Sequence, residues 1–115
     1  MNLDDRSVHF IGIGGAGMSA IAKVLLERGS KVSGSDLKMS RAAAMLEAMG
    51  ATVHIGHDPD HVGAEQVVVY SSAIPPSNPE LRRAEELGLE VMTRGEALAA
   101  VLHDRKAVVV AGTHG

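Results

Sequence analysis

The feature that most constrains the fold is a glycine-rich stretch at residues 7–28, with the sequence SVHFIGIGGAGMSAIAKVLLER. Its first residues are apolar over the length of a strand, and its last residues carry apolar side chains at helical spacing. Between them, Gly12, Gly14 and Gly17 have the spacing G-x-G-x-x-G. The first glycine allows a tight turn, the second lets phosphates approach the backbone, and the third lets the helix pack close to the strand. This order of strand, turn and helix predicts a phosphate-binding turn at a helix amino terminus rather than an ordinary glycine loop.

Composition and charge narrow the class of protein. The chain has 115 residues, 45% of them hydrophobic, which is enough for one compact domain with its own core. Eleven basic and fourteen acidic residues give a net charge of -3 with no block of like charge, so we expect neither nucleic acid nor a membrane as a partner. The chain has no cysteine, no signal-peptide pattern and no apolar run of membrane-spanning length, which favours a cytoplasmic protein.

Strand and helix patterns alternate along the rest of the chain. Strand patterns occur at residues 31–36, 52–55, 67–70 and 89–92, the first of which ends in an acid. Helices are expected between them, capped by Ser40, by Asn78 before Pro79, and by Thr93 in a capping box with Glu96. The spacings are too long for hairpins. They predict an α/β fold: a Rossmann-like open parallel sheet of about five strands, in the order 3-2-1-4-5, with helices on both faces.

Apolar spacing also predicts which helical side chains enter the core. In the helix after Ser40, the shared face carries Ala42, Met45, Leu46 and Met49. In the helix after Thr93, the expected buried side chains are Leu98, Val101 and Leu102. The methionines are expected to fill the core rather than to bind a cofactor.

The end of the chain does not fit this single sheet. Residues 107–112 have a sixth strand pattern, followed only by Thr113, His114 and Gly115. A strand that enters a glycine turn resembles the start of a second phosphate loop. We therefore expect an amino-terminal fragment, with residues 1–106 as one domain and residues 107–115 as the first strand and truncated loop of another. Such an unpaired strand is expected to fray or to mediate self-association.

The ends of the predicted strands bring polar residues to one rim of the sheet, where ligands of open α/β sheets bind. The candidates are Gly14, Gly15, Ala16, Gly17, Asp36, His57, Ser71, Ser72 and Arg94. Asp36 lies nineteen residues after Gly17, where an acid accepts hydrogen bonds from ribose hydroxyls, although an aspartate also commonly begins a turn. His57 could donate to a nucleotide. Ser71 and Ser72 could bind the ligand or cap their loop, and Arg94 could lie near the ligand or in solvent.

The sequence indicates no metal site and no catalytic residue. His54, His57, Asp58, Asp60 and His61 lie close together in the sequence. A strand at residues 52–55 and a turn at Pro59 would keep the three rings from converging on zinc, so we expect no bound metal. No nucleophile has an evident base, and no carboxylate pair has a useful spacing.

Three segments together resemble the amino-terminal domain of the bacterial Mur ligases. They are HFIGIGGAGMSAIAKVLLERGSKVSGSDL, VVVYSSAIPPSNPEL and VVVAGTHG, and the resemblance extends from Val8 to the end of the chain. Within the family it points to the members that join L-alanine to UDP-N-acetylmuramic acid in peptidoglycan synthesis, with the tripeptide-recycling ligases as near relatives. Ala20 departs from the glycine expected after Gly-Met-Ser.

The resemblance implies that this domain holds the uridine diphosphate part of UDP-N-acetylmuramic acid. The diphosphate contacts fall on Gly14, Gly15, Ala16 and Gly17, and the ribose and uracil contacts fall on Asp36, His57, Ser71 and Ser72. A central domain would bind ATP through a loop G-T-x-G-K-[ST], whose first half matches Gly112, Thr113, His114 and Gly115. ATP and Mg²⁺ would serve the full-length ligase, in which an acyl phosphate on the sugar is attacked by the amine of L-alanine. The fragment itself is expected to hold neither and to be non-catalytic.

Two other functions remain open on the sequence. The glycine turn and Asp36 would equally suit the nucleotide-binding domain of an NAD-dependent oxidoreductase. The chain could also be a non-catalytic nucleotide-sensing module. The second glycine loop and the absence of a hydride-transfer partner argue against the oxidoreductase.

Overall fold

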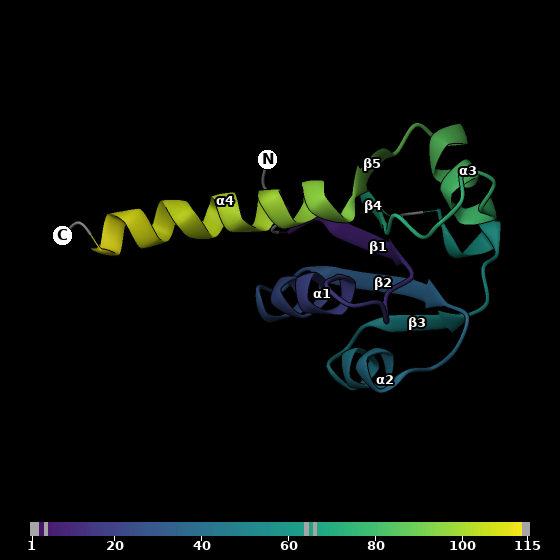
Figure 1. Ribbon diagram of the computed structural model, residues 1–115, viewed down its shortest axis with the longest axis horizontal. Coiled ribbons are helices and arrows are strands. Elements are labelled where there is room, and N and C mark those ends of the chain that lie inside the picture. Colours follow the sequence, from purple (N-terminus) through teal and green to yellow (C-terminus); the bar gives the residue numbers. More distant parts are fainter. Residues whose placement is uncertain (1–2, 4, 64, 66, 114–115) are drawn as a thin grey trace.

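The computed structural model describes residues 3, 5–63, 65 and 67–113, and shows a five-stranded parallel sheet. The strands are β1 (Ser7–Ile11), β2 (Lys31–Asp36), β3 (Thr52–Ile55), β4 (Val67–Tyr70) and β5 (Glu90–Thr93). Their order is β3-β2-β1-β4-β5, and every neighbouring pair is parallel. The predicted fold class and strand order are confirmed. All carboxyl ends of the strands therefore lie at one rim, which is marked by the arrowheads in Figure 1.

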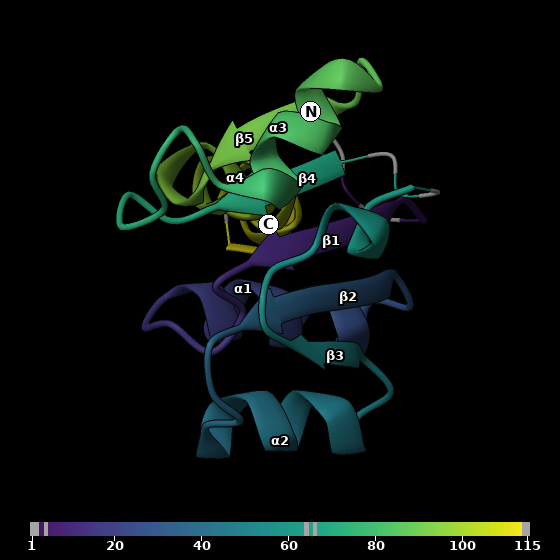
Figure 2. The same ribbon diagram turned by 90° about the vertical axis from the view of Figure 1, so that its right-hand side faces the viewer.

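Helices cover both faces of this sheet (Figures 1 and 2). They are α1 (Met18–Glu27), α2 (Arg41–Ala48), the 3₁₀ turn η1 (Pro59–His61), α3 (Pro79–Glu86) and α4 (Arg94–Thr113). Helices α1, α2 and α4 pack on one face, and η1 and α3 pack on the other. Figure 2 shows α2 beside β3 at one end of the sheet and α3 beside β4 and β5 at the other.

The predicted caps define where the helices begin. Ser40 Oγ accepts a hydrogen bond from the N–H of Ala43 at 3.1 Å, and Asn78 Oδ1 accepts one from the N–H of Glu80 at 2.9 Å. Thr93 and Glu96 form a reciprocal capping box, with distances of 2.8 and 3.1 Å. These bonds satisfy N–H groups that have no partner within their own helices.

The core lies on both faces of the sheet, and the buried faces of two helices match the predicted faces only in part. Met18, Ile21, Ala22 and Leu25 of α1 are buried, as expected from their spacing. Helix α2 buries Ala43 and the predicted Leu46, and α4 buries Ala97, Ala100 and the predicted Val101. Met45, Met49, Leu98 and Leu102 are exposed, so their predicted burial is wrong. Small alanine side chains on the inner faces allow these helices to pack close, at the cost of leaving larger apolar groups in solvent.

The strand predicted for residues 107–112 is wrong, because these residues continue helix α4 to Thr113. A helix satisfies its backbone hydrogen bonds internally, whereas a sixth strand would need a neighbouring strand to pair with. Gly112 and Thr113 therefore lie in a helix, while His114 and Gly115 are outside the described residues. The self-association expected through such a strand therefore has no strand to rest on in the described residues. Among the described helices, none is both long and apolar enough to cross a membrane.

Candidate functional site

The glycine turn joins the carboxyl end of β1 to the amino end of α1. Gly12 and Gly17 have φ values of 87° and 82°, which favour glycine over residues with a Cβ. The N–H groups of Gly12 and Ile13 donate to the carbonyl of Ser35 at 2.8 and 3.0 Å, so the turn is fastened to β2. Gly17 is the N-cap of α1, and in the described structure it provides no side-chain hydrogen bond to the first turn. The N–H groups of Gly15 and Ser19 donate to the carbonyls of Gly12 and Gly15. Among the described residues, those of Ala16, Gly17 and Met18 are therefore the ones that can face an anion, together with the positive dipole end of α1.

Gly14 is enclosed by the end of β2 and the start of α2. Its N–H donates to Asp36 Oδ2 at 2.8 Å. A Cβ at position 14 would lie 2.5 Å from Ser40 Oγ and 2.8 Å from the same Asp36 oxygen. Close packing therefore requires glycine at this position, and the turn and Asp36 are brought together as predicted from their spacing.

Asp36 also makes a local contact of the kind expected if an aspartate begins a turn, which was the alternative to ribose binding. Its Oδ1 accepts a hydrogen bond from the N–H of Leu37 at 2.8 Å. The carboxylate is half-buried at the rim, and each of its oxygens has a further lone pair for a hydroxyl donor. Bracing of the turn and binding of a ribose are therefore compatible, and the ribose contact stays a prediction.

Arg94, the first residue of α4, lies beside the amino end of α1. A Cβ at Gly17 would be 3.0 Å from one guanidinium nitrogen of Arg94. The arginine is exposed and helps to line a groove of about 160 Å³ between α1 and α4. This places a permanent positive charge at the helix terminus where an anion would bind.

Ser71 and Ser72 follow β4 on the other side of the glycine turn. Ser71 Oγ is 3.7 Å from where a Cβ on Gly12 would lie, and its carbonyl accepts from the N–H of Ile74 at 3.0 Å. Ser71 is half-buried and Ser72 is exposed. Of the two serines, Ser71 is thus the one placed directly against the turn.

A buried carboxylate that the sequence analysis did not single out lies behind this rim. Glu80, in the first turn of α3, is completely buried. Its Oε1 accepts from His9 Nε2 at 2.6 Å and from Ser35 Oγ at 2.8 Å. Its Oε2 accepts from His61 Nδ1 at 2.9 Å and from the N–H of Asp58 at 3.1 Å. Burial alone would raise the pKa of Glu80, but the hydrogen bonds from His9 and His61 outweigh it and lower the pKa to about 2.

The histidines near β3 contact this carboxylate or one another. His57 Nδ1 is 2.9 Å from Ser35 Oγ and 3.5 Å from Glu80 Oε2. The rings of His54 and His61 stack with their centroids 4.0 Å apart, and burial, followed by the proximity of His61, lowers the pKa of His54. Within the part of the chain that the structure describes, no three His, Cys, Asp or Glu side chains are arranged to hold a metal ion.

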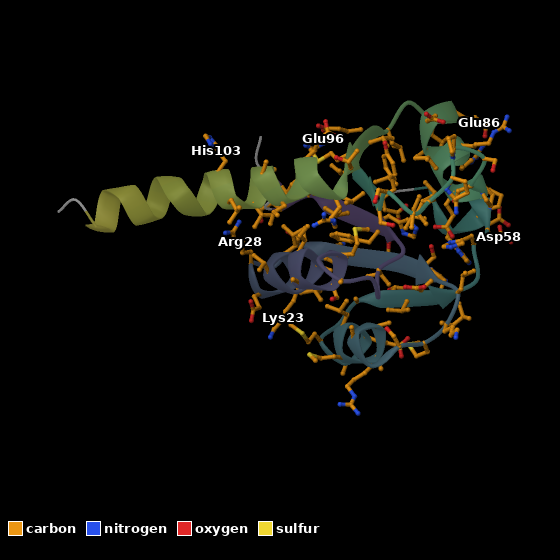
Figure 3. All side chains as sticks on the ribbon, in the orientation of Figure 1. Lys23, Arg28, Asp58, Glu86, Glu96 and His103 are labelled. Carbon is orange, nitrogen blue, oxygen red and sulfur yellow. The ribbon has the colours of Figure 1, made fainter. Side chains whose placement is uncertain are left out.

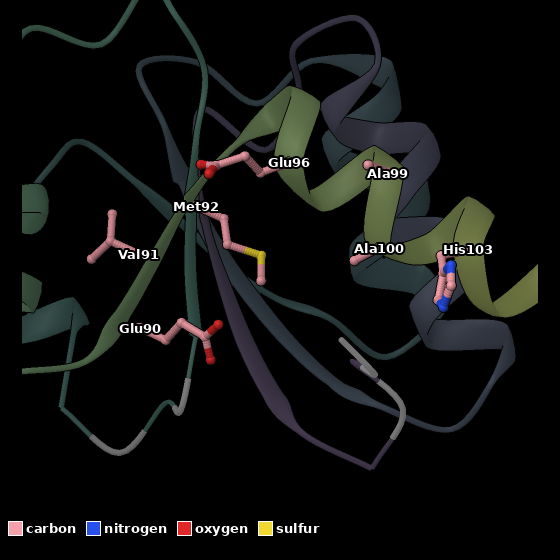
Figure 4. Close-up of a pocket in the computed structure, with 7 residues that line it drawn as sticks. All are labelled: Glu90, Val91, Met92, Glu96, Ala99, Ala100 and His103. Atoms are coloured by element: carbon pink, nitrogen blue, oxygen red, sulfur yellow. The ribbon is translucent and has the colours of Figure 1, made fainter.

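A separate cavity of about 310 Å³ lies between β5 and α4 (Figure 4). It is lined by Glu90, Val91, Met92, Glu96, Ala99, Ala100 and His103. Glu90 stands at the amino end of β5, and its carboxylate pairs with Arg6 at 3.0 Å. Figure 3 shows His103 on α4, far from Asp58 at the arrowhead rim. Two carboxylates make this cavity unsuited to a diphosphate, so it is not part of the candidate site.

The chain matches one described family and several named ligases. A family model described as "Mur ligase family, catalytic domain" matches residues 7–106. The UDP-N-acetylmuramate–L-alanine ligase of Streptomyces coelicolor is 58% identical over 108 residues, covering 93% of this chain and 23% of that protein. The UDP-N-acetylmuramate–alanine ligase MurC of Thermotoga maritima superposes with a TM-score of 0.84 at 30% identity, over 88% of this chain and 24% of that one. A murein peptide ligase of Psychrobacter arcticus gives a TM-score of 0.76 at 25% identity, and the match covers 82% of this chain and 20% of that one. The chain thus spans about a quarter of the length of the curated relative it matches.

Proposed function

The chain belongs to the Mur ligase family, and on that premise we propose that it binds the uridine diphosphate part of UDP-N-acetylmuramic acid at the carboxyl rim of its sheet. The observation that supports the proposal is the glycine turn, which Asp36 braces through the N–H of Gly14 at 2.8 Å, so that the N–H groups of the following residues at the start of α1 are left to face the ligand. The turn places the amino end of α1 and the guanidinium of Arg94 next to each other. Backbone donors, a helix dipole and a fixed cation together suit a diphosphate.

In this proposal each part of the rim takes one part of the ligand. The diphosphate lies on Gly14, Gly15, Ala16 and Gly17, with Arg94 beside it. The ribose hydroxyls donate to Asp36, the base lies near His57, and Ser71 and Ser72 close the other side. Because β1 and β2 are adjacent in the sheet, the turn and Asp36 are spaced for neighbouring groups of one nucleotide.

We further propose that the full-length protein is a cytoplasmic, ATP-dependent ligase that adds L-alanine to UDP-N-acetylmuramic acid in peptidoglycan synthesis. The name of the Streptomyces coelicolor relative supports this over a tripeptide-recycling activity. Residues 1–106 would be the sugar-nucleotide domain, with ATP and Mg²⁺ bound by other parts of the protein. Gly112 and Thr113, in helix α4, do not form a phosphate loop here, and the described residues offer no ligand set for Mg²⁺. This chain's own residues therefore bind and orient the sugar nucleotide.

Parallel calorimetric titrations with UDP-N-acetylmuramic acid, ATP and NADH separate this proposal from its rivals. We expect weak but measurable binding of the UDP-sugar, and affinities for ATP and NADH that are at least about tenfold lower, a difference of roughly 1.4 kcal/mol. For ATP the reason is that the described residues contain one complete phosphate-binding turn, at the start of α1, and none at residues 112–113. The lower affinity for NADH follows from the ligase proposal itself, since the turn alone would suit either diphosphate. A preference for NADH would support the oxidoreductase alternative and overturn the ligase proposal.

The substitution Asp36→Ala is expected to weaken UDP binding by roughly 1 to 3 kcal/mol, the usual cost of removing a charged hydrogen-bond partner. Titration of the variant with UDP measures this loss. Asp60→Ala is the matched control, because Asp60 is an exposed aspartate in η1 outside the proposed contacts. Identical titration curves for Asp36→Ala and the parent would remove Asp36 from the site.

A further inference from the structure

The hydrogen-bond network around Glu80 determines where protons lie at the rim. An ionised carboxylate only accepts hydrogen bonds and has about four lone-pair positions. Four donors fill these positions: His9 Nε2 and Ser35 Oγ on Oε1, and His61 Nδ1 and the N–H of Asp58 on Oε2. With its pKa lowered to about 2, Glu80 is ionised at neutral pH. In each of these four contacts, the hydrogen therefore belongs to the partner group and not to Glu80.

This requirement fixes the orientation of the Ser35 hydroxyl. Ser35 Oγ lies 2.8 Å from Glu80 Oε1, so its single proton points toward the carboxylate. The same oxygen is 2.9 Å from His57 Nδ1 and can take part in that contact only as an acceptor. His57 Nδ1 therefore carries a hydrogen.

The distance from His57 to the carboxylate leads to the same assignment independently. His57 Nδ1 is 3.5 Å from Glu80 Oε2. A lone pair on Nδ1 would face a negative charge at short range, whereas an N–H would be attracted to it. In a neutral imidazole with its proton on Nδ1, the other nitrogen, Nε2, is a hydrogen-bond acceptor.

His57 lies at the same rim as Asp36, and the proposed function puts the base of the nucleotide beside it. It follows Gly56, whose N–H donates to the carbonyl of Asp36 at 2.7 Å, so the ends of β2 and β3 are joined at the rim. The His57 side chain is 15% exposed, and among the described residues no hydrogen-bond partner is seen for its Nε2. An unprotonated nitrogen at the rim is suited to an N–H or O–H donor and unsuited to phosphate oxygens.

We infer that Ser35 and Glu80 are positioning residues that hold His57 as an acceptor for the imide N–H of uracil, so that the site selects uridine over cytidine nucleotides. This inference rests on the proposed function. Uracil carries a hydrogen on N3, whereas cytosine carries a lone pair there and would oppose the lone pair of His57 Nε2. A site built to pair with an N–H disfavours an analogue that lacks it, because the buried polar group is left without a partner.

Nitrogen-15 NMR of the histidine rings tests the first half of the inference on the parent chain at pH 8. We expect His57 to show a protonated Nδ1 and an unprotonated Nε2, and the Nε2 resonance to shift when UDP is added. Predominance of the opposite tautomer, with the proton on Nε2, would overturn the inference. Because it uses the unaltered chain, this measurement does not depend on any variant folding.

Titrations with UDP, CDP and the UDP analogue methylated at N3 test the second half. The parent should bind UDP at least about tenfold more tightly than either competitor, a ratio equivalent to roughly 1.4 kcal/mol. In Ser35→Ala this preference should shrink toward equal affinities. Ser33→Ala is the matched control on the same strand, because Ser33 Oγ contacts His9 Nδ1 at 2.7 Å rather than His57, and it should keep the preference.

The outcomes separate this inference from the proposed function. If the parent binds UDP, CDP and the methylated analogue equally well, the role of His57 is wrong while uridine diphosphate binding stands. If the parent shows the preference and Ser35→Ala keeps it, Ser35 does not position the ring. If the parent binds no pyrimidine diphosphate at all, the proposed function itself is wrong.

Discussion

Replacing Glu80 with alanine is expected to lower the free energy of unfolding by about 3 to 5 kcal/mol, the usual cost of removing one partner from a buried ionic network. The change would leave His9 Nε2, His61 Nδ1 and the Ser35 hydroxyl without their shared acceptor. His9 and Ser35 are completely buried, so water cannot readily replace the carboxylate. The expected loss is a large fraction of the total stability of a domain of this size.

Urea unfolding followed by circular dichroism measures this loss, with Glu86→Ala as the matched control. Glu86 is on the same helix, α3, and is exposed, as Figure 3 shows for its side chain at the surface. We expect the control to change the free energy of unfolding by no more than about 0.5 kcal/mol. Equal midpoints and slopes for the two variants would show that the network around Glu80 contributes little to stability.

The same network makes stability depend on pH in the acidic range. The pKa of Glu80 falls from 4.5 to about 2 in the folded protein, so the unfolded chain binds the proton first as the pH is lowered. The stabilisation is complete above pH 4.5 and is lost between 4.5 and about 2, with a slope of at most about 1.4 kcal/mol per pH unit. In Glu80→Gln, the free energy of unfolding should lose this part of its dependence on pH. If the parent and Glu80→Gln show the same slope between pH 4.5 and about 2, other groups cause the effect.

Signals within short segments predicted most of the fold. Val67, Val68 and Val69 are apolar on both faces of a strand and are fully buried in β4 beside the central strand β1. Asn78 with Pro79 marks the start of α3, and the Thr93 and Glu96 pair marks that of α4. Each of these signals depends only on neighbouring residues, so no tertiary contact was needed to recognise it.

The errors in the fold come from choices that tertiary contacts decide. Helical spacing gives a face for α4 but does not say whether Leu98 or Ala97 points inward. In the structure, Ala97 is buried and Leu98 is 38% exposed. The apolar run at residues 107–112 likewise suits a strand or a helix, and the part of the chain that the structure describes offers no strand beside it. Periodicity alone could not decide either case.

The candidate site was predictable where its residues belong to one short segment of the chain. The glycine turn and Asp36 belong to one βαβ unit, whose spacing is set by its own helix, and the 2.8 Å contact between Gly14 and Asp36 follows from it. The Glu80 network joins residues as far apart as His9 and Glu80, which are 71 positions apart. A glutamate in the first turn of a helix is usually explained by the helix dipole. The one sequence signal for this network was the alternation of side chains along β1, which puts His9 on the face of the sheet opposite to that of Phe10.

Gly14→Ala is expected to reduce the affinity for UDP by a factor of about 100, roughly 2.7 kcal/mol, while the domain still folds. The added methyl group would lie 2.5 Å from Ser40 Oγ and 2.8 Å from Asp36 Oδ2, so both must move. The movement would displace the carboxylate that holds the N–H of Gly14 and would distort the turn on which the diphosphate is proposed to lie. Overpacking of this kind is expected to lower the free energy of unfolding by only about 1 to 3 kcal/mol.

Calorimetric titration with UDP and urea unfolding of Gly14→Ala, compared with Gly63→Ala, measure the two effects separately. Gly63 is exposed, has no atom within 4 Å of where its Cβ would lie, and has no positive φ, so alanine should be accepted there without loss of stability or binding. Normal UDP affinity in Gly14→Ala would show that the phosphates do not approach this turn. Because the added methyl group also moves Asp36, a loss of affinity without unfolding that exceeds the loss in Asp36→Ala would support a diphosphate on the turn where Asp36, the amino end of α1 and Arg94 meet.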